Sequence, residues 1–258
     1  MNNASGKILF VVVLVAVGFT TYLRTSSRQA TQRFEQSAKE FKQKAQALMQ
    51  RQMAGEDVGA EHEKLFSDFI AEADKAGNEA SGKDARAMRA IGLTLRDLQG
   101  PMRAYNAAFT ELMSAGGSAP EGIKSVADVE KRLALIEKLR EGNEALDAVF
   151  KAMPDRMKTN LQAADLPSSE IESALNGFRS NAKLDLVAQI RQSDRDLVAA
   201  MRGQFELLKS EFGKWKLVEG GAVEFQNNAA ADKFDKLYHD IQAAADKQEK
   251  LQRQALGR

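Results

Sequence analysis

Residues Ile8 to Leu23 form an uncharged apolar run of sixteen residues, ILFVVVLVAVGFTTYL. A helix of this length spans about 24 Å, a little less than the hydrocarbon core of a bilayer, and Lys7 and Arg24 can extend their charges to the two surfaces. No other segment is apolar on all sides, which disfavours a buried core helix. We therefore predict an N-terminal transmembrane anchor over residues 1–24.

A cleaved signal peptide is the alternative for this segment. Such a peptide combines a basic start, a short apolar core and small residues at the cleavage site. Lys7 supplies the basic start, but the apolar core is long and no A-x-A pattern follows it. The chain contains no cysteine, so it cannot carry the N-terminal lipid of a lipoprotein. The sequence thus favours an uncleaved, single-pass anchor.

The charges that flank the run give conflicting signals about its orientation. Arg24, Arg28 and Arg33 follow it, and the positive-inside rule read strictly places the body in the cytoplasm. A short basic tail before a signal-like run is instead the common arrangement for export. We expect export of the body.

Composition limits the classes of function. The 258 residues are 28% charged with a formal net charge of +1, which disfavours nucleic-acid binding as the main task. Zero cysteines and only two histidines, His62 and His239, disfavour a zinc or thiol site. We expect no cofactor, no metal and one elongated domain over residues 25–258.

Apolar residues recur every three or four positions through most of this domain, as is typical of amphipathic helices. The first helix is expected to continue from the anchor with a coiled-coil seam, and the cleanest stripe follows over about 83–114. We predict further helices over about 61–76, 125–153, 154–164, 168–213 and 228–254. The seam of the helix that continues from the anchor comprises Phe34, Ala38, Phe41, Ala45 and Leu48.

Prolines and glycines punctuate this pattern. Pro101 predicts a kink near Arg96–Leu98, because proline removes a backbone donor and clashes with the preceding turn. Pro154 is expected to open a separate short helix. The glycine-rich segment 115–122 predicts a loop, and the polar residues 248–258 are expected to fray.

The segment 215–225 interrupts the helical pattern. Val218 and Val223 flank Glu-Gly-Gly-Ala, which predicts a small β-hairpin. Trp215 and Phe225 could offer an aromatic anchor to a protein partner, or could instead close the open end of the bundle. The predicted fold is therefore all-α: an elongated antiparallel helical bundle or coiled coil with one small hairpin, on a transmembrane helix.

Two polar features have both a functional and a plain interpretation. Arg191, Asp194 and Arg195 share one helical face, and Asp194 falls where the seam expects an apolar residue. A buried polar layer or an anion site is possible, but a surface salt-bridge cluster is the prediction, since exposed pairs of this spacing are common. His62 is expected to be solvated at a helix start, and the Asp235–His239 pair is too common by chance to predict a metal site.

The end of the chain resembles a known family over about thirty residues. Phe212-Gly-Lys-Trp-Lys-Leu-Val-Glu-Gly-Gly-Ala-Val-Glu-Phe225, followed by Ala231-Asp-Lys-Phe-Asp-Lys-Leu237, is similar to the end of a family of bacterial envelope lipoproteins of unknown function. This chain departs from the family in having no lipidation cysteine and a longer apolar run. The resemblance implies a bacterial envelope setting, which adds to the argument for export, and it implies no chemistry.

These observations together predict a bacterial inner-membrane protein with a periplasmic body. We expect it to be non-enzymatic, to contact the bilayer through its N-terminal helix, and to bind a protein partner or self-associate. The alternative is a periplasmic helical-bundle ligand sensor that acts through a separate signalling partner, because the chain has no second apolar run of its own.

Overall fold

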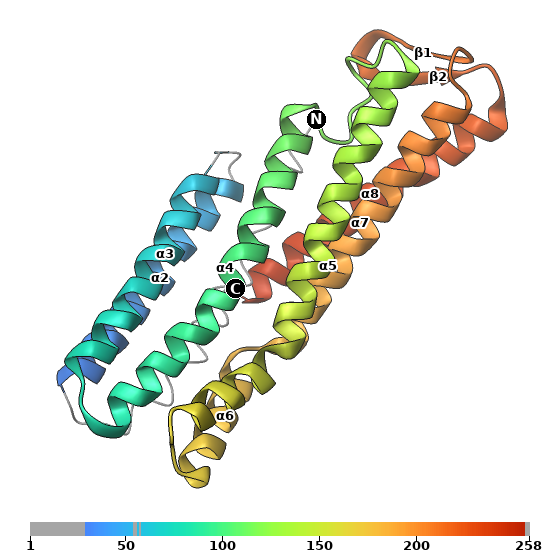
Figure 1. Cartoon of the computed structure of the whole chain (residues 1–258). Coiled ribbons are helices and arrows are strands. Elements are labelled where there is room, and N and C mark those ends of the chain that lie inside the picture. Colours follow the sequence, from blue (N-terminus) through green and yellow to red (C-terminus); the bar gives the residue numbers. More distant parts are fainter. Residues whose placement is uncertain (1–28, 54–55, 57, 256–258) are drawn as a thin grey trace.

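The computed structural model describes residues 29–53, 56 and 58–255 (Figure 1). This part of the chain is mostly helical, with one small two-stranded antiparallel sheet, which confirms the predicted helical bundle and hairpin. None of its helices is both long and apolar enough to span a bilayer. The predicted anchor, from Ile8 to Leu23, lies outside the described residues.

The elements follow one another along the chain, and the longest connection between them is the loop over residues 115–125. The helices are α2 (Gln29–Met53), α3 (Gly59–Glu79), α4 (Gly82–Ser114), α5 (Val126–Ala163), α6 (Ser168–Asn181), α7 (Leu184–Ser210) and α8 (Asn228–Ala255). The strands are β1 (Trp215–Leu217) and β2 (Val223–Phe225), with Trp215 opposite Phe225 and the 3₁₀ turn η2 (Glu219–Gly221) between them.

Each long helix packs against the next one in the order α2, α3, α4, α5, α7 and α8. Figure 1 shows that the hairpin lies at one end of the elongated molecule, whereas α6 and the turn between α3 and α4 lie at the other. The first turn of α2 is also at the end far from the hairpin. With 38 residues, α5 alone spans about 57 Å, so the two ends are well separated.

The seam predicted on the first helix packs against α3. Phe34 stacks on Phe69 with ring centroids 5.4 Å apart, and Phe41 stacks on Phe69 at 4.5 Å. These rings belong to one continuous core of buried side chains that extends from Phe34 to Leu251. The described part of α2 is thus a member of the bundle.

Pro101 and Pro154 both lie inside helices, and the prediction is confirmed for Pro101 but not for Pro154. α4 continues through Pro101 and bends near its middle, as predicted (Figure 1). The prediction that a new helix begins at Pro154 is wrong, because α5 continues through this residue to Ala163. Met153, Met157 and Leu161 remain fully buried on both sides of the proline, and this packing offsets the lost backbone hydrogen bond.

The prediction of one unbroken helix over residues 168–213 is also wrong. The helix ends at Asn181, and α7 begins at Leu184 after Lys183, whose φ of 45° and ψ of 45° are left-handed. Phe178 and Ala182 before the break and Val187 after it are all buried. The apolar spacing therefore carries across the interruption, and the stripe does not reveal it.

Candidate functional site

A buried polar cluster lies where four helices of the bundle meet. It comprises Tyr105 from α4, Asn143 from α5, Arg191 and Asp194 from α7, and Gln248 from α8, each at most 2% exposed. Charged side chains are almost never buried to this degree unless they are paired. The cluster is therefore the least expected feature of an otherwise apolar core.

The guanidinium of Arg191 is surrounded on three sides. Its Nη2 lies 2.8 Å from Asp194 Oδ2, and its Nη1 donates a 3.3 Å hydrogen bond to Asn143 Oδ1. Its Cζ lies 5.1 Å from the centroid of the Tyr105 ring, a cation–π distance. Asn143 Nδ2 also donates to the backbone oxygen of Arg191, which fixes α5 to α7 at this level.

The carboxylate of Asp194 connects three helices. It accepts hydrogen bonds from Gln248 Nε2 on α8 and from the hydroxyl of Tyr105 on α4. Burial raises the pKa of Asp194 to about 6, although the charge of Arg191 acts in the opposite direction. Burial also raises the pKa of Tyr105 well above 10, so its hydroxyl keeps its proton.

The predicted surface salt-bridge cluster is therefore wrong for two of its three members. Arg191 and Asp194 form a buried polar layer, which was the alternative to the predicted surface cluster. Arg195 does lie at the surface and pairs with Asp147 at 3.0 Å. The available signal was that Asp194 occupies a seam position, and the seam continues in the buried Leu197 and Met201.

The last turns of α8 cover this layer. Ser193 Oγ donates a 2.8 Å hydrogen bond to the backbone oxygen of Ala244, and Gln248, Leu251 and Gln252 are all buried. The prediction that the chain frays from residue 248 is therefore wrong as far as Ala255, where the described part of α8 ends. The polar side chains misled the prediction because two of the glutamines face the core.

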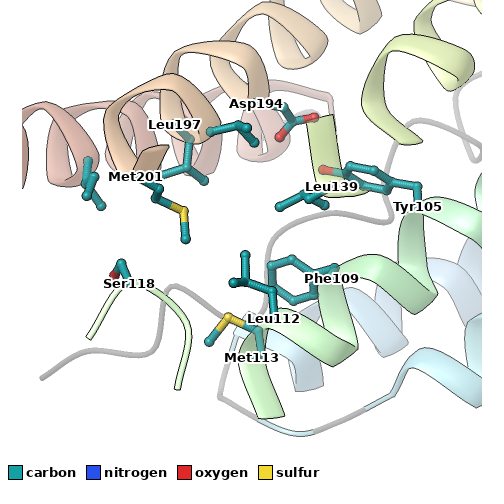
Figure 2. A pocket seen from close by; sticks show the side chains of 11 residues that line it. Tyr105, Phe109, Leu112, Met113, Ser118, Leu139, Asp194, Leu197 and Met201 are labelled. Atoms are coloured by element: carbon teal, nitrogen blue, oxygen red, sulfur yellow. The ribbon is translucent and has the colours of Figure 1, made fainter. Parts of the chain in front are cut away.

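A small cavity adjoins the polar layer (Figure 2). Its volume is about 30 Å³, and Asp194 and Tyr105 form its polar end. Figure 2 shows the Tyr105 hydroxyl and the Asp194 carboxylate turned toward one another beside the cavity, with Ser118 on the far side. The other lining residues are Phe109, Leu112, Met113, Leu139, Leu197, Val198, Met201 and Ile241.

The loop between α4 and α5 closes the cavity at Ser118. Its position was predicted, and Gly116 and Gly117 adopt the positive φ values of 105° and 59° that glycine permits. Arg132 Nη1 donates to the backbone oxygens of Gly117 at 2.6 Å and Ala119 at 3.3 Å. A capping box between Ser125 and Asp128 begins α5 directly after this loop.

The same loop contacts the hairpin. The carboxylate of Glu121 lies directly against Gly221 in the hairpin turn, where a side chain would have no room. The cavity, the loop and the hairpin are thus joined through consecutive contacts. Figure 1 shows the loop and the hairpin side by side at the same end of the molecule.

Trp215 and Phe225 are half-buried and pack against the core. Trp215 Nε1 donates a 2.9 Å hydrogen bond to the backbone oxygen of Leu208 at the end of α7, and the Phe225 ring lies 5.4 Å from that of Phe234 on α8. Both aromatics therefore fasten the hairpin to the bundle. Three other apolar residues at this end are more exposed, namely Phe212 at 36%, Leu217 at 37% and Val218 at 37%.

His62 is not the solvated residue that was predicted. It is 5% exposed in the first turn of α3, and its Nε2 has no hydrogen-bond partner. Burial lowers its pKa to about 4. Nothing in the local sequence indicates this burial, because Glu61 and Glu63 on either side are typical of a solvent-facing turn.

His239 is exposed on α8 with its ring 6.2 Å from that of Tyr238. Among the residues described, no group of three or more histidine and carboxylate side chains is placed to hold a metal ion. The polar cluster is held by hydrogen bonds and a charge pair between buried side chains.

A scan of the chain against protein-family models finds no match, and searches of curated proteins and of solved structures find none either. Inferences about function therefore rest on the geometry described above.

Proposed function

We propose that this chain is a membrane-anchored, non-enzymatic protein of the bacterial inner membrane that binds a protein partner, or a second copy of itself, through its hairpin end. In this proposal the apolar run from Ile8 to Leu23 is the single-pass anchor, and the helical body lies in the periplasm. The binding surface consists of Phe212, Leu217 and Val218, together with the half-buried Trp215 and Phe225 of the two strands.

The observation that carries this proposal is that three of the six exposed large apolar residues among those described, Phe212, Leu217 and Val218, lie within one short segment at the hairpin end. Exposed apolar side chains concentrated in one region of a domain commonly mark an interaction site, whereas scattered ones are ordinary. Aromatic residues on a rigid base are also typical of binding hot spots. The hydrogen bond from Trp215 to Leu208 supplies that rigidity at the hairpin.

The arrangement of the ends supports the same proposal. The described part of α2 starts at Gln29, six positions after the predicted anchor ends at Leu23, and lies there at the end of the molecule far from the hairpin (Figure 1). An anchor at one end would direct the hairpin away from the membrane. A partner in the aqueous space could then reach Leu217 and Val218 without crossing the lipid surface.

The test substitutes lysine for Leu217 in the full chain. We expect Leu217→Lys to abolish co-purification of the partner or of a differently tagged second copy, because it places a charge in the centre of an apolar contact. Leu93→Lys is the matched control, since Leu93 is 48% exposed on α4, away from the hairpin. Equal recovery of bound protein from both variants and from the wild type would contradict the proposal.

A ligand sensor is the second candidate, and the cavity beside Asp194 is the observation that favours it. A sensor of this kind would pass its signal to a separate protein. The contacts from Ser118 through Glu121 to Gly221 offer a route from the cavity to the hairpin surface.

A further inference from the structure

The cavity between α4, α5, α7 and α8 has walls of two kinds. Most of its lining is apolar and comes from leucine, isoleucine, valine, phenylalanine and methionine side chains. Polar side chains lie mainly at one end, where Asp194 and Tyr105 face one another, and Ser118 adds a single hydroxyl on the far side (Figure 2). A molecule that fits must therefore be mainly hydrocarbon and carry a single polar group at one end.

The charge balance of the polar end limits what that group can be. The positive charge of Arg191 already compensates Asp194 at 2.8 Å, so the pair is neutral as a whole. An ammonium or carboxylate ligand would add an uncompensated charge to a buried site, which is costly. The polar group of the ligand must be neutral.

The hydrogen bonding of Asp194 indicates whether that group donates or accepts. Oδ1 accepts from Gln248, and Oδ2 lies in the ion pair with Arg191 without a hydrogen bond of normal geometry. The Tyr105 hydroxyl also donates to this carboxylate, which has about four acceptor sites and can therefore accept a further donor. Asp194 is 1% exposed, and a buried carboxylate oxygen gains from a donor. A hydroxyl group supplies one without charge.

The size of the cavity sets the length of the hydrocarbon part. A volume of about 30 Å³ accommodates roughly two water-sized groups. Met113 and Met201 form part of the wall, and methionine side chains adapt readily to irregular spaces. The site therefore suits a molecule of two or three non-hydrogen atoms, or slightly more if these methionines move.

We propose that this cavity is a binding site for a short-chain neutral alcohol, whose hydroxyl donates to Asp194 Oδ2 and whose alkyl group contacts Leu112, Leu139 and Met201. The inference deepens the sensor candidate and does not depend on whether the hairpin binds a protein. Val198 and Ser118 complete the enclosure on the sides away from Asp194.

The experiment uses the full chain in detergent with ¹³C-labelled methionine methyl groups, and ethanol as the probe. We expect the methyl signals of Met113 and Met201 to shift and saturate with ethanol. Met88 and Met157 are fully buried but do not line the cavity, so their signals should not follow this curve. Shifts that grow linearly at all four methionines would overturn the proposal, because they would report a general solvent effect.

Two comparisons make the test specific. Val198→Ile places one more methyl group in the cavity and should weaken ethanol binding by about tenfold or more, whereas Val126→Ile on the exposed start of α5 should leave it unchanged. Ethylammonium should not saturate the signals. The role given to Asp194 would be overturned if ethylammonium saturated the methyl signals of Met113 and Met201 as ethanol does. It would also be overturned if xenon saturated them with the same affinity as ethanol. None of these outcomes bears on the Leu217→Lys test, so the two proposals fail separately.

Discussion

Arg191 and Asp194 form an ion pair, three residues apart on α7, in which the two side chains are 0% and 2% exposed. Tyr105, Asn143 and Gln248 supply its neighbours from the three surrounding helices. The pair is thus the point through which α4, α5, α7 and α8 are held in one register. Replacing one of the two charged residues should therefore change the free energy of unfolding differently from replacing both.

Arg191→Met should destabilise the fold by about 3–5 kcal/mol, because it leaves Asp194 as an uncompensated buried charge. The double variant Arg191→Met with Asp194→Leu should recover most of that loss, since both charges are gone. Urea unfolding followed by circular dichroism measures the free energies. Additive losses in the double variant would show that the two side chains do not act as a pair.

His62 predicts a dependence of stability on pH. Its pKa is lowered to about 4 in the folded chain by burial, from an ordinary value of 6.5. The unfolded chain therefore binds a proton at a pH where the folded chain does not. This contribution to stability is fully present above pH 6.5 and is lost as the pH falls through 4, by at most about 3 kcal/mol.

The measurement compares the wild type with His62→Phe from pH 7 to pH 4. The free energy of unfolding of the wild type should fall relative to that of His62→Phe on acidification, because only the wild type carries the titrating group. Asp194 acts oppositely, since its raised pKa of about 6 adds stability as the pH falls. Asp194 is present in both chains, so it cancels from the difference. Parallel pH profiles would contradict the burial of His62.

Lys183 predicts an unusual response to glycine. Its φ of 45° and ψ of 45° cost a residue with a side chain about 1–2 kcal/mol, whereas glycine adopts them freely. Lys183→Gly should therefore be neutral or slightly stabilising in thermal unfolding, although glycine elsewhere in a helix is destabilising. Lys183→Val should destabilise. If Lys183→Gly lowers the midpoint as much as Lys183→Val, the break between α6 and α7 is not left-handed there.

Trp215 is expected to hold the hairpin to the bundle. Trp215→Phe removes the hydrogen bond to Leu208 but keeps an aromatic ring, and should cost about 0.5–1.5 kcal/mol. Trp215→Ala removes both and should open the hairpin locally. Hydrogen exchange of the amides of Val218 and Gln226, which bond to Ala222 and Lys214, should then accelerate while the helices stay protected. Unchanged exchange would mean that other contacts hold the hairpin.

The periodicity of apolar residues was sufficient to predict most of the helices and the hairpin. The stripe around Met88 and Leu95 is fully buried, and the turn at Gly220 and Gly221 separates the two strands. Such patterns depend on local spacing, which the sequence contains directly. The positions where helices end were harder to predict. A single left-handed residue at Lys183 does not disturb the apolar spacing, so the break there was missed. The packing of Met157 and Leu161 keeps Pro154 inside a helix, so the break predicted there does not occur.

The candidate site could not be predicted with the same success. A charged residue at a seam position is compatible with rotation of the helix toward solvent, and only the neighbouring helices decide otherwise. Gln248 and Tyr105 lie far from Asp194 in the sequence, so no spacing joins them. His62 was missed for a related reason, since its burial comes from packing between helices and its neighbours on the chain are charged.

The central claim, that the hairpin end binds a protein, is tested most directly by photo-crosslinking in native membranes. A photoreactive residue is placed at Val218, and in a parallel chain at Leu93, both exposed apolar positions. We predict a discrete, higher-mass crosslinked product from position 218, identified by mass spectrometry as one partner protein or a second copy, and none from position 93. Discrete products of equal yield from both positions, or none from position 218, would contradict the claim.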